Sequence, residues 1–339
     1  MASMTRRTAL TAAAASLAAS SAQAVGGDGA RRLRVAVAQM QSDNHDVDGN
    51  LARAEGFAER AARRGARLVL FPELMPGGYS LYYDIWDNAE PAHGKTSRWL
   101  ARTSRRLGVW LGTSFLEADG EDFFNTFVMT GPDGAECGRV RKQAPAATEA
   151  YFFKGAVGSH VIETAIGRIG VGICAENYYC FIANQMSQGQ VDFILMPHSA
   201  PISPVSPPTP GTHLGLWYAR RLGVPVAFVN KVGPWVTRTL LPPPAETRSS
   251  FPGLSAIVDS DASVLVSMNG EPDIGVADIT LDPHRRAAPA ELSAGFGIPE
   301  LAVGGPAVVA AIARAQMTGA QSYATNPERP LRARAISGG

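Results

Sequence analysis

Runs of consecutive apolar residues that alternate with helical segments constrain the fold of this chain more than any other feature. The runs at 33–39 and 67–71 enclose a segment, 47–64, whose apolar residues recur at helical spacing. The same alternation continues with apolar runs at 109–115, 169–173, 191–196 and 224–229 and with helices predicted over 96–107, 178–188 and 212–222. Strands that are apolar on both faces must be covered on both faces. The pattern therefore predicts an α/β fold in which helices cover the sheets.

Turn signals add antiparallel pairs to this scheme. Gly131-Pro132-Asp133-Gly134 separates strands predicted over 123–129 and 135–141, and a second hairpin is predicted around 165–167. The remaining predicted strands make the sheets mixed, and they cover 255–259, 263–267 and 274–280. Proline-rich segments at 201–210 and 241–252 are predicted to be long loops. Beyond residue 283 we expect only a short helix over 307–317 and a tail over 322–339.

Residues 1–24 carry the features of an export signal in the order that such signals have. Arg6-Arg7 comes first, an alanine-rich stretch begins at Ala9, and Ala22-Gln23-Ala24 forms a small-x-small cleavage site. The paired arginines and the weakly hydrophobic stretch resemble a twin-arginine signal. We therefore expect a mature chain that begins at Val25 and is exported to the periplasm or secreted. It would consist of one domain over 25–282 and a C-terminal extension over 283–339.

Composition and charge exclude several kinds of partner. The formal net charge of the 339 residues is +1 and the basic residues are spread along the chain, so no basic patch for nucleic acid or an anionic membrane is expected. No apolar run after the N-terminus is long enough for a membrane span. Three cysteines cannot form a disulfide framework, and the six histidines show no paired spacing for a metal. With no glycine-rich phosphate motif either, we expect no metal or cofactor and a small-molecule substrate.

Three residues at the ends of predicted strands have side chains that could carry chemistry. Cys174 lies between an apolar strand and a predicted helix, where helix-terminal N–H groups lower the pKa of a thiol and bind an oxyanion. Glu73 abruptly ends an apolar run, and Lys142 follows a hairpin strand. Each residue taken alone also fits a structural role. Cys174 could be a small core residue, Glu73 a surface carboxylate and Lys142 a solvated charge at a sheet edge.

The order of the three segments is more informative than any one of them. Phe71-Pro72-Glu73, Arg141-Lys142-Gln143-Ala144-Pro145 and Gly172-Ile173-Cys174-Ala175-Glu176 together resemble the nitrilase, or carbon-nitrogen hydrolase, superfamily. The resemblance covers about residues 34–278 and implies a four-layer αββα sandwich. It also implies that Cys174 is the nucleophile, Glu73 the general base and Lys142 the group that stabilises the tetrahedral intermediate. Members usually pair into dimers, so a homodimer or higher homo-oligomer is expected, with contacts from the C-terminal extension.

Other residues near these motifs are candidates for the site. Glu149 resembles the second glutamate of the superfamily, which orients the lysine and water. Ala175 stands where true nitrilases have tryptophan, and this departure favours an amide over a nitrile; its backbone N–H is a candidate oxyanion donor. Tyr79 and Tyr178 belong to aromatic clusters beside Glu73 and Cys174, and His198 ends the next strand. These three are candidate pocket residues, although core packing explains aromatic clusters equally well.

The chemistry of amides fits the same residues. An amide carbonyl is a poor electrophile, so its hydrolysis needs a thiolate, a proton carrier for the departing nitrogen and a cation for the oxyanion. The sequence therefore predicts hydrolysis of a non-peptide carbon-nitrogen bond in a small amide through a cysteine thioester, with release of ammonia and a carboxylic acid. The alternatives are a nitrilase, an acyltransferase of the same superfamily, and a catalytically silent member that binds a ligand.

Overall fold

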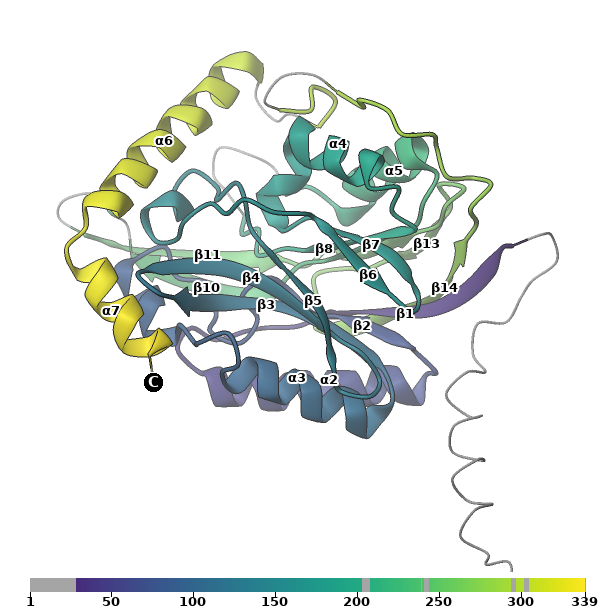
Figure 1. Cartoon of the computed structure of the whole chain (residues 1–339), viewed down its shortest axis with the longest axis horizontal. Helices are drawn as coiled ribbons and strands as arrows, with labels where there is room; N and C mark the ends of the chain where they lie inside the picture. The colour runs from purple at the N-terminus through teal and green to yellow at the C-terminus, as the bar shows by residue number, and fades with distance from the viewer. Residues whose placement is uncertain are drawn as a thin grey trace, which may run out of the picture.

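Two six-stranded mixed sheets face each other at the centre of the molecule, and helices cover their outer faces (Figure 1). The computed structural model describes residues 29–202, 208–238, 240, 244–293, 297–301 and 305–338. The predicted export signal therefore lies outside the described residues. The strand order is β14-β1-β2-β3-β4-β5 in the first sheet and β13-β12-β9-β8-β7-β6 in the second.

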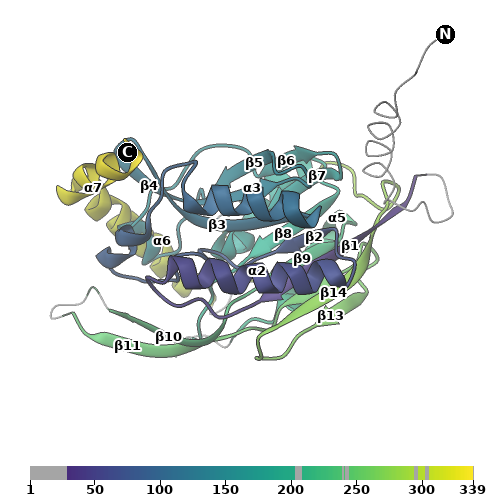
Figure 2. The ribbon, with the colours of Figure 1, turned by 90° about the horizontal axis from the view of Figure 1, so that it is seen from below.

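The first sheet contains the parallel neighbours β1, β2 and β3, with antiparallel strands on both sides. Its strands are β1 (Arg31–Gln39), β2 (Leu68–Leu70), β3 (Trp110–Asp119), β4 (Asp122–Thr130), β5 (Glu136–Arg141) and β14 (Asp273–Leu281). Two helices, α2 (Val47–Arg63) and α3 (Lys95–Leu107), lie on its outer face (Figure 2). The Asp46 side chain caps the first turn of α2, and α3 ends at Gly108 in the left-handed conformation that favours glycine.

The second sheet repeats this arrangement with the parallel neighbours β7, β8 and β9. Its strands are β6 (Val161–Thr164), β7 (Gly167–Val171), β8 (Phe193–Pro197), β9 (Val226–Val229), β12 (Ala256–Val258) and β13 (Val264–Ser267). The helices α4 (Cys180–Gln188) and α5 (Gly211–Leu222) cover its outer face (Figure 1).

Alternation along each central strand explains why these strands are apolar without interruption. In β1, Val35 and Val37 belong to the core between the two sheets, whereas Ala36 and Ala38 pack under α2 and α3. A third core lies between the second sheet and α4 and α5. Three buried layers of side chains separate four layers of secondary structure, so the predicted four-layer αββα sandwich is confirmed.

The prediction of a long loop over 241–252 is wrong in its second half. The strand β11 (Glu246–Pro252) pairs antiparallel with β10 (Val232–Arg238) in a separate two-stranded sheet. Its sequence is polar because most of its side chains are not buried, and only Phe251 enters the core. Trp235 of β10 and Phe251 of β11 both pack on Tyr79, outside the hairpin, with ring centroids 6.0 Å and 6.2 Å away. The hairpin is thus held by tertiary packing that a local pattern does not reveal.

The expected C-terminal tail is instead helical. The helices α6 (Gly305–Thr325) and α7 (Glu328–Ser337) run along one end of the sandwich (Figure 1). Tyr323 and Ala333 are buried there in an aromatic cluster with residues of the first half of the chain. Three arginines of α7 bind carboxylates of the same chain, as Arg329 with Asp122, Arg332 with Asp87 and Arg334 with Glu121. No helix among the described residues has the length and apolar character that crossing a membrane requires.

Candidate active site

The ends of parallel strands from both sheets meet at one edge of the sandwich, and the predicted catalytic residues lie there. Glu73 follows β2 of the first sheet, and Cys174 follows β7 of the second. Two hydrogen bonds join the sheets at this point, because the Glu73 N–H donates to the His198 carbonyl (3.3 Å) and the Ser199 hydroxyl donates to the Glu73 carbonyl (2.7 Å). The carboxyl ends of parallel strands are the usual place for a ligand site in α/β proteins.

Lys142 bridges two carboxylates in the interior. Its Nζ donates to Glu73 Oε1 and to Glu149 Oε2, each at 2.7 Å, and all three side chains are buried. Asn125 Nδ2 also donates to Glu73 Oε1 (2.8 Å), and the Tyr79 hydroxyl donates to Glu149 Oε1 (2.8 Å). The structure therefore brings Glu73, Lys142 and Glu149 into one hydrogen-bonded cluster. Buried charges are tolerated when they are paired and hydrogen-bonded in this way.

Cys174 stands on a strained turn. Its φ is 53°, in the left-handed region that non-glycine residues rarely adopt. The turn begins a 3₁₀ helix, η3 (Cys174–Tyr178), that the sequence did not indicate, and the helix predicted over 178–188 follows it as α4. Asn177 Nδ2 holds the turn by donating to the carbonyls of Gly172 (2.8 Å) and Cys174 (3.1 Å). Since the first N–H groups of a helix have no partner within it, the Ala175 N–H stays a candidate oxyanion donor.

Glu176 joins two segments of the site: the loop that follows Lys142, called the lysine loop below, and the turn at Cys174, called the nucleophile turn. Its Oε1 accepts from the N–H groups of Gln143 (2.6 Å) and Ala144 (3.2 Å), and its Oε2 accepts from the Ile173 N–H (3.1 Å). These partners adjoin Lys142 on one side and Cys174 on the other. The sequence indicated Glu176 only as part of a motif, because nothing in the local pattern shows which distant N–H groups a carboxylate will reach. Asn125 was missed for the same reason.

Burial sets the protonation of the cluster. It raises the pKa of the Cys174 thiol well above its usual value, and the negative charge of Glu73 raises that pKa further. Burial and the neighbouring carboxylates therefore outweigh any lowering of this pKa by helix N–H groups. Burial also raises the pKa of Glu73, against the opposing Lys142 ammonium. For Lys142, burial lowers the pKa, but the charges of Glu149 and Glu73 outweigh burial and hold the pKa well above its usual value.

These directions give a resting site with a neutral thiol, a lysine ammonium and a carboxylate that takes up protons readily. One oxygen of Glu73, Oε2, is buried without a hydrogen bond of normal geometry among the described residues. The Cys174 thiol lowers the pKa of Glu73 as a hydrogen-bond donor does. Glu73 Oε2 is thus able to accept a further hydrogen bond.

The remaining predicted pocket residues have different surroundings. Burial raises the pKa of Tyr178 to about 12, the Thr209 side chain binds its hydroxyl, and Cys174 is close enough to act on that pKa. His198 is buried, its Nε2 lies 3.0 Å from Asn177 Nδ2, and burial lowers its pKa, so its ring is neutral. Tyr79 contacts Glu149, as described above. His198 therefore contacts Asn177, the residue whose side chain holds the turn at Cys174.

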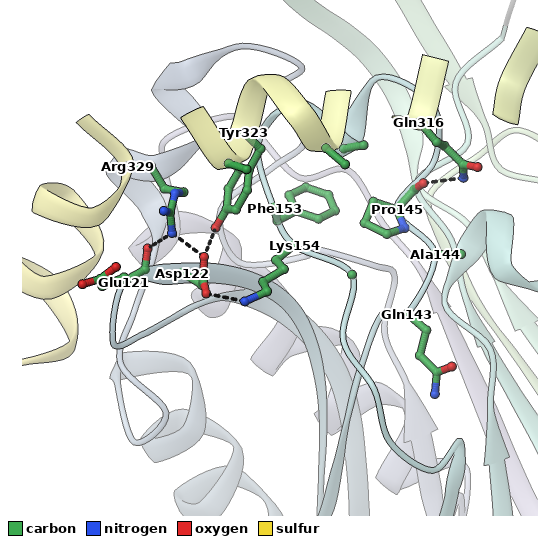
Figure 3. A pocket seen from close by; sticks show the side chains of 14 residues that line it. Glu121, Asp122, Gln143, Ala144, Pro145, Phe153, Lys154, Gln316, Tyr323 and Arg329 are labelled. Carbon is green, nitrogen blue, oxygen red and sulfur yellow. Dashed lines mark hydrogen bonds and ion pairs between the residues drawn. The ribbon is translucent and has the colours of Figure 1, made fainter. Parts of the chain in front are cut away.

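A cavity of about 660 Å³ lies beside the lysine loop and not at the cluster itself (Figure 3). It is lined by residues 143–145, 150 and 153–155 together with side chains of β4, α6 and α7, and by none of Glu73, Lys142, Glu149 and Cys174. Two cationic side chains of its lining, Lys154 and Arg329, both pair with Asp122 (Figure 3). Within the described residues no group of His, Cys, Asp or Glu side chains is arranged to hold a metal ion.

Comparison with known proteins agrees with the fold and the motifs. The family model for carbon-nitrogen hydrolases matches residues 34–288. The chain therefore belongs to the carbon-nitrogen hydrolase family, and the predicted nitrilase-superfamily membership is confirmed. An enzyme that hydrolyses carbon-nitrogen bonds is the class of protein that this fold and these motifs define.

The similar proteins of this family include both nitrilases and amidases. The chain is 29% identical over 254 residues to a nitrilase of Pyrococcus abyssi, covering 74% of this chain and 90% of the relative. It is 28% identical over 178 residues to the N-carbamoylputrescine amidase of Arabidopsis thaliana, covering 49% of this chain and 59% of that protein. Among solved structures, an amidase from Nesterenkonia sp. superposes with a TM-score of 0.64 at 22% identity, over 74% of this chain and 91% of the amidase. This last likeness concerns the fold alone.

Proposed function

We propose that the protein hydrolyses the carbon-nitrogen bond of a small amide and releases ammonia and a carboxylic acid through a thioester on Cys174. One observation carries the proposal. A buried thiol on a strained turn adjoins a carboxylate that is bound to a buried lysine, and a second carboxylate holds the same lysine. Nucleophile, proton acceptor and cation are the three parts that acyl transfer from an amide requires.

In the first half of the reaction Glu73 takes the proton of Cys174 and the sulfur attacks the amide carbon. The electron pair of the carbonyl bond moves to oxygen, where the Lys142 ammonium and the Ala175 N–H stabilise the oxyanion. Glu73 then gives its proton to the amide nitrogen, the carbon-nitrogen bond breaks and ammonia leaves. A raised pKa suits Glu73 to this exchange, because its carboxylate takes up a proton more readily than an exposed carboxylate does.

In the second half Glu73 takes a proton from water, and the hydroxide attacks the thioester carbon. Collapse of the second tetrahedral intermediate breaks the carbon-sulfur bond and returns the proton to sulfur. Glu149 acts through Lys142, which it binds at 2.7 Å, and its own position is fixed by the Tyr79 hydroxyl and the Ala146 N–H (2.6 Å). Glu149 therefore keeps the ammonium directed at the oxyanion in both halves.

Ala175 is the residue that favours an amide over a nitrile. In true nitrilases a tryptophan follows the cysteine, and here a methyl group leaves room beside the nucleophile. With a nitrile the first adduct would be a thioimidate, which the same groups could protonate. The residues that perform the chemistry serve both substrates, so the choice between them depends on the space around Ala175.

Export and self-association belong to the same proposal. Residues 1–24 have the order of a twin-arginine signal, which supports delivery of the folded enzyme outside the cytoplasm. Family membership supports a homodimer or a higher homo-oligomer. Light scattering on the chain from Val25 measures the oligomeric state.

Ammonia release by the chain from Val25 tests the function. The panel contains simple amides, N-carbamoyl compounds and nitriles, each measured beside a Cys174→Ala variant. We expect release from amides that the variant abolishes. Release from nitriles alone would make the protein a nitrilase, and no release from any compound would favour acyl transfer or ligand binding.

A further inference from the structure

A second lysine, Lys231, is buried beside the cluster without a carboxylate partner. It follows β9, at the same edge of the sandwich as Glu73 and Cys174, and its side chain is fully buried. Its Nζ donates to the Leu74 carbonyl at 3.1 Å. Within the described part of the chain, no Asp or Glu oxygen lies within ion-pair distance of this nitrogen. A buried ammonium without an ion pair is unfavourable, so its position needs an explanation.

Aromatic rings form the rest of its surroundings. Nζ lies 5.9 Å from the ring centroid of Tyr79 and 5.7 Å from that of Phe251. Ring faces attract a cation, but less strongly than a carboxylate does. Lys231 is therefore held by one carbonyl and two rings in a site that excludes water.

The carbonyl that Lys231 binds belongs to the turn that carries Glu73. Leu74 has a φ of 45°, a left-handed conformation that is strained for leucine. The Ser114 hydroxyl accepts from the Leu74 N–H at 2.8 Å, and Lys231 binds the carbonyl of the same residue. The N–H and the carbonyl of the strained residue are thus both fixed, by a side chain of β3 and by one from the segment between β9 and β10. The position of the Glu73 carboxylate depends on this turn.

Lys231 also interacts electrostatically with the catalytic groups. Burial lowers the pKa of Lys231 to about 7, and the charges of Glu73 and Cys174 act in the opposite direction. Glu73 comes from the end of β2, Cys174 from the end of β7, and Tyr79 is the third ionisable group that faces the nitrogen. Electrostatic interaction is reciprocal, so the charged lysine lowers the pKa of Glu73. Below about pH 7, where Lys231 is an ammonium, it therefore favours ionised Glu73.

We propose that Lys231 is a positioning residue that fixes the turn carrying Glu73 and keeps this carboxylate ionised, ready to take the proton of Cys174. The inference rests on the proposed role of Glu73 as the base. It assigns to the site a second cation whose task differs from that of Lys142. Lys142 binds Glu73 directly and faces the oxyanion, whereas Lys231 acts through the Leu74 carbonyl and through its charge.

Three variants separate the hydrogen bond from the charge. Lys231→Met removes both, Lys231→Gln keeps a donor for the Leu74 carbonyl without the charge, and Lys231→Arg keeps both. The readout is the rate at which iodoacetamide alkylates Cys174, measured on the peptide by mass spectrometry across the acidic and neutral pH range. This rate needs no substrate turnover, and it rises as Glu73 ionises because the carboxylate takes the thiol proton. Thermal unfolding of each variant is measured first, and if the Met variant does not fold, the Gln variant carries the test.

We expect the pH midpoint of alkylation to move up by about one unit in the Met and Gln variants and to stay at the wild-type value in the Arg variant. We also expect Gln to react faster than Met above the midpoint, because the turn is still held. An unchanged midpoint in the folded Met or Gln variant would overturn the proposal. A Glu73→Gln control separates the two hypotheses: if it leaves the midpoint in place, the proposed base role fails, whatever the lysine variants do.

Discussion

Lys142 and Lys154 lie near the two ends of the same loop and both bind carboxylates, but their surroundings differ completely. Lys142 is 0% exposed and bridges Glu73 and Glu149, which are also buried. The Lys154 side chain is 53% exposed and binds Asp122 at 2.7 Å, at the rim of the cavity below α6 and α7 (Figure 3). The distances are equal, so geometry alone does not distinguish the proposed catalytic lysine from a surface lysine.

The difference shows that the energetic contribution of an ion pair depends on its burial and on how many charged groups share it. Water screens the Lys154 pair, so this pair contributes at most about 1 kcal/mol to stability. Removing Lys142 would leave two carboxylates in the interior without their cation, which costs several times as much. Water exclusion also makes the Lys142 ammonium effective toward an oxyanion, because charges interact strongly in a medium of low dielectric.

Lys142→Met and Lys154→Met form a matched pair that tests this difference. For Lys142→Met we expect a loss of about 3–5 kcal/mol in the free energy of unfolding and at least about 10³-fold in kcat/KM. For Lys154→Met we expect a loss of less than about 1 kcal/mol in the free energy of unfolding and an unchanged kcat/KM. Urea unfolding and steady-state ammonia release measure the two effects. Equal effects of the two substitutions would contradict the account.

Glu176→Gln tests whether the support between the lysine loop and the nucleophile turn is as important as the cluster. Glutamine offers one acceptor oxygen where the carboxylate binds three N–H groups, and its NH₂ would face a donor. We expect a loss of about 2 kcal/mol in stability and slower alkylation of Cys174. Urea unfolding and peptide-resolved alkylation check this, and wild-type values for both would show that the turn and the loop are positioned by other contacts.

Gly319→Ala and Gly56→Ala test the packing of the C-terminal helices. A Cβ on Gly319 of α6 would lie 2.9 Å from Ala150 Cβ, beside Glu149, whereas one on Gly56 of α2 meets nothing within 4 Å. We expect Gly56→Ala to stabilise the fold by about 0.5–1 kcal/mol and Gly319→Ala to destabilise it by about 1 kcal/mol, with a lower activity. Thermal unfolding of the two variants shows whether each substitution stabilises or destabilises the fold. If both substitutions raised the unfolding temperature, α6 would not pack closely on the segment that contains Glu149 and Ala150.

Glu73 and Cys174 could be predicted from the sequence because they end strongly apolar strands, and Lys142 and Glu149 because they match the motifs of a family. Glu73 and Cys174 each follow a continuous buried run, and the order of the three motifs identified the family. The hydrogen-bond partners could not be predicted in the same way. Asn125 contacts Glu73, Glu176 contacts the segments that adjoin Lys142 and Cys174, and Lys231 contacts the turn after Glu73. These contacts span distances in sequence that no local pattern records.

The regions beyond the sandwich were predicted less well, for physical reasons. Strand β11 is mostly unburied, so it lacks the apolar alternation that marks a strand. Helix α6 contains Gly319, which is unfavourable in an isolated helix but allows close approach to Ala150. The arginines of α7 indicated a solvated tail, whereas they bind carboxylates of β4, η1 (Tyr83–Asn88) and the turn before β4.

The central claim is that Cys174 carries the acyl group, and mass spectrometry of the enzyme during turnover tests it most directly. The wild-type protein is mixed with an amide from which it releases ammonia, quenched in acid and digested. We expect the peptide containing Cys174 to gain the mass of the acyl group, hydroxylamine to remove that group, and Cys174→Ala to release no ammonia. Ammonia release that persists in Cys174→Ala, or an acyl group found on another residue, would contradict it.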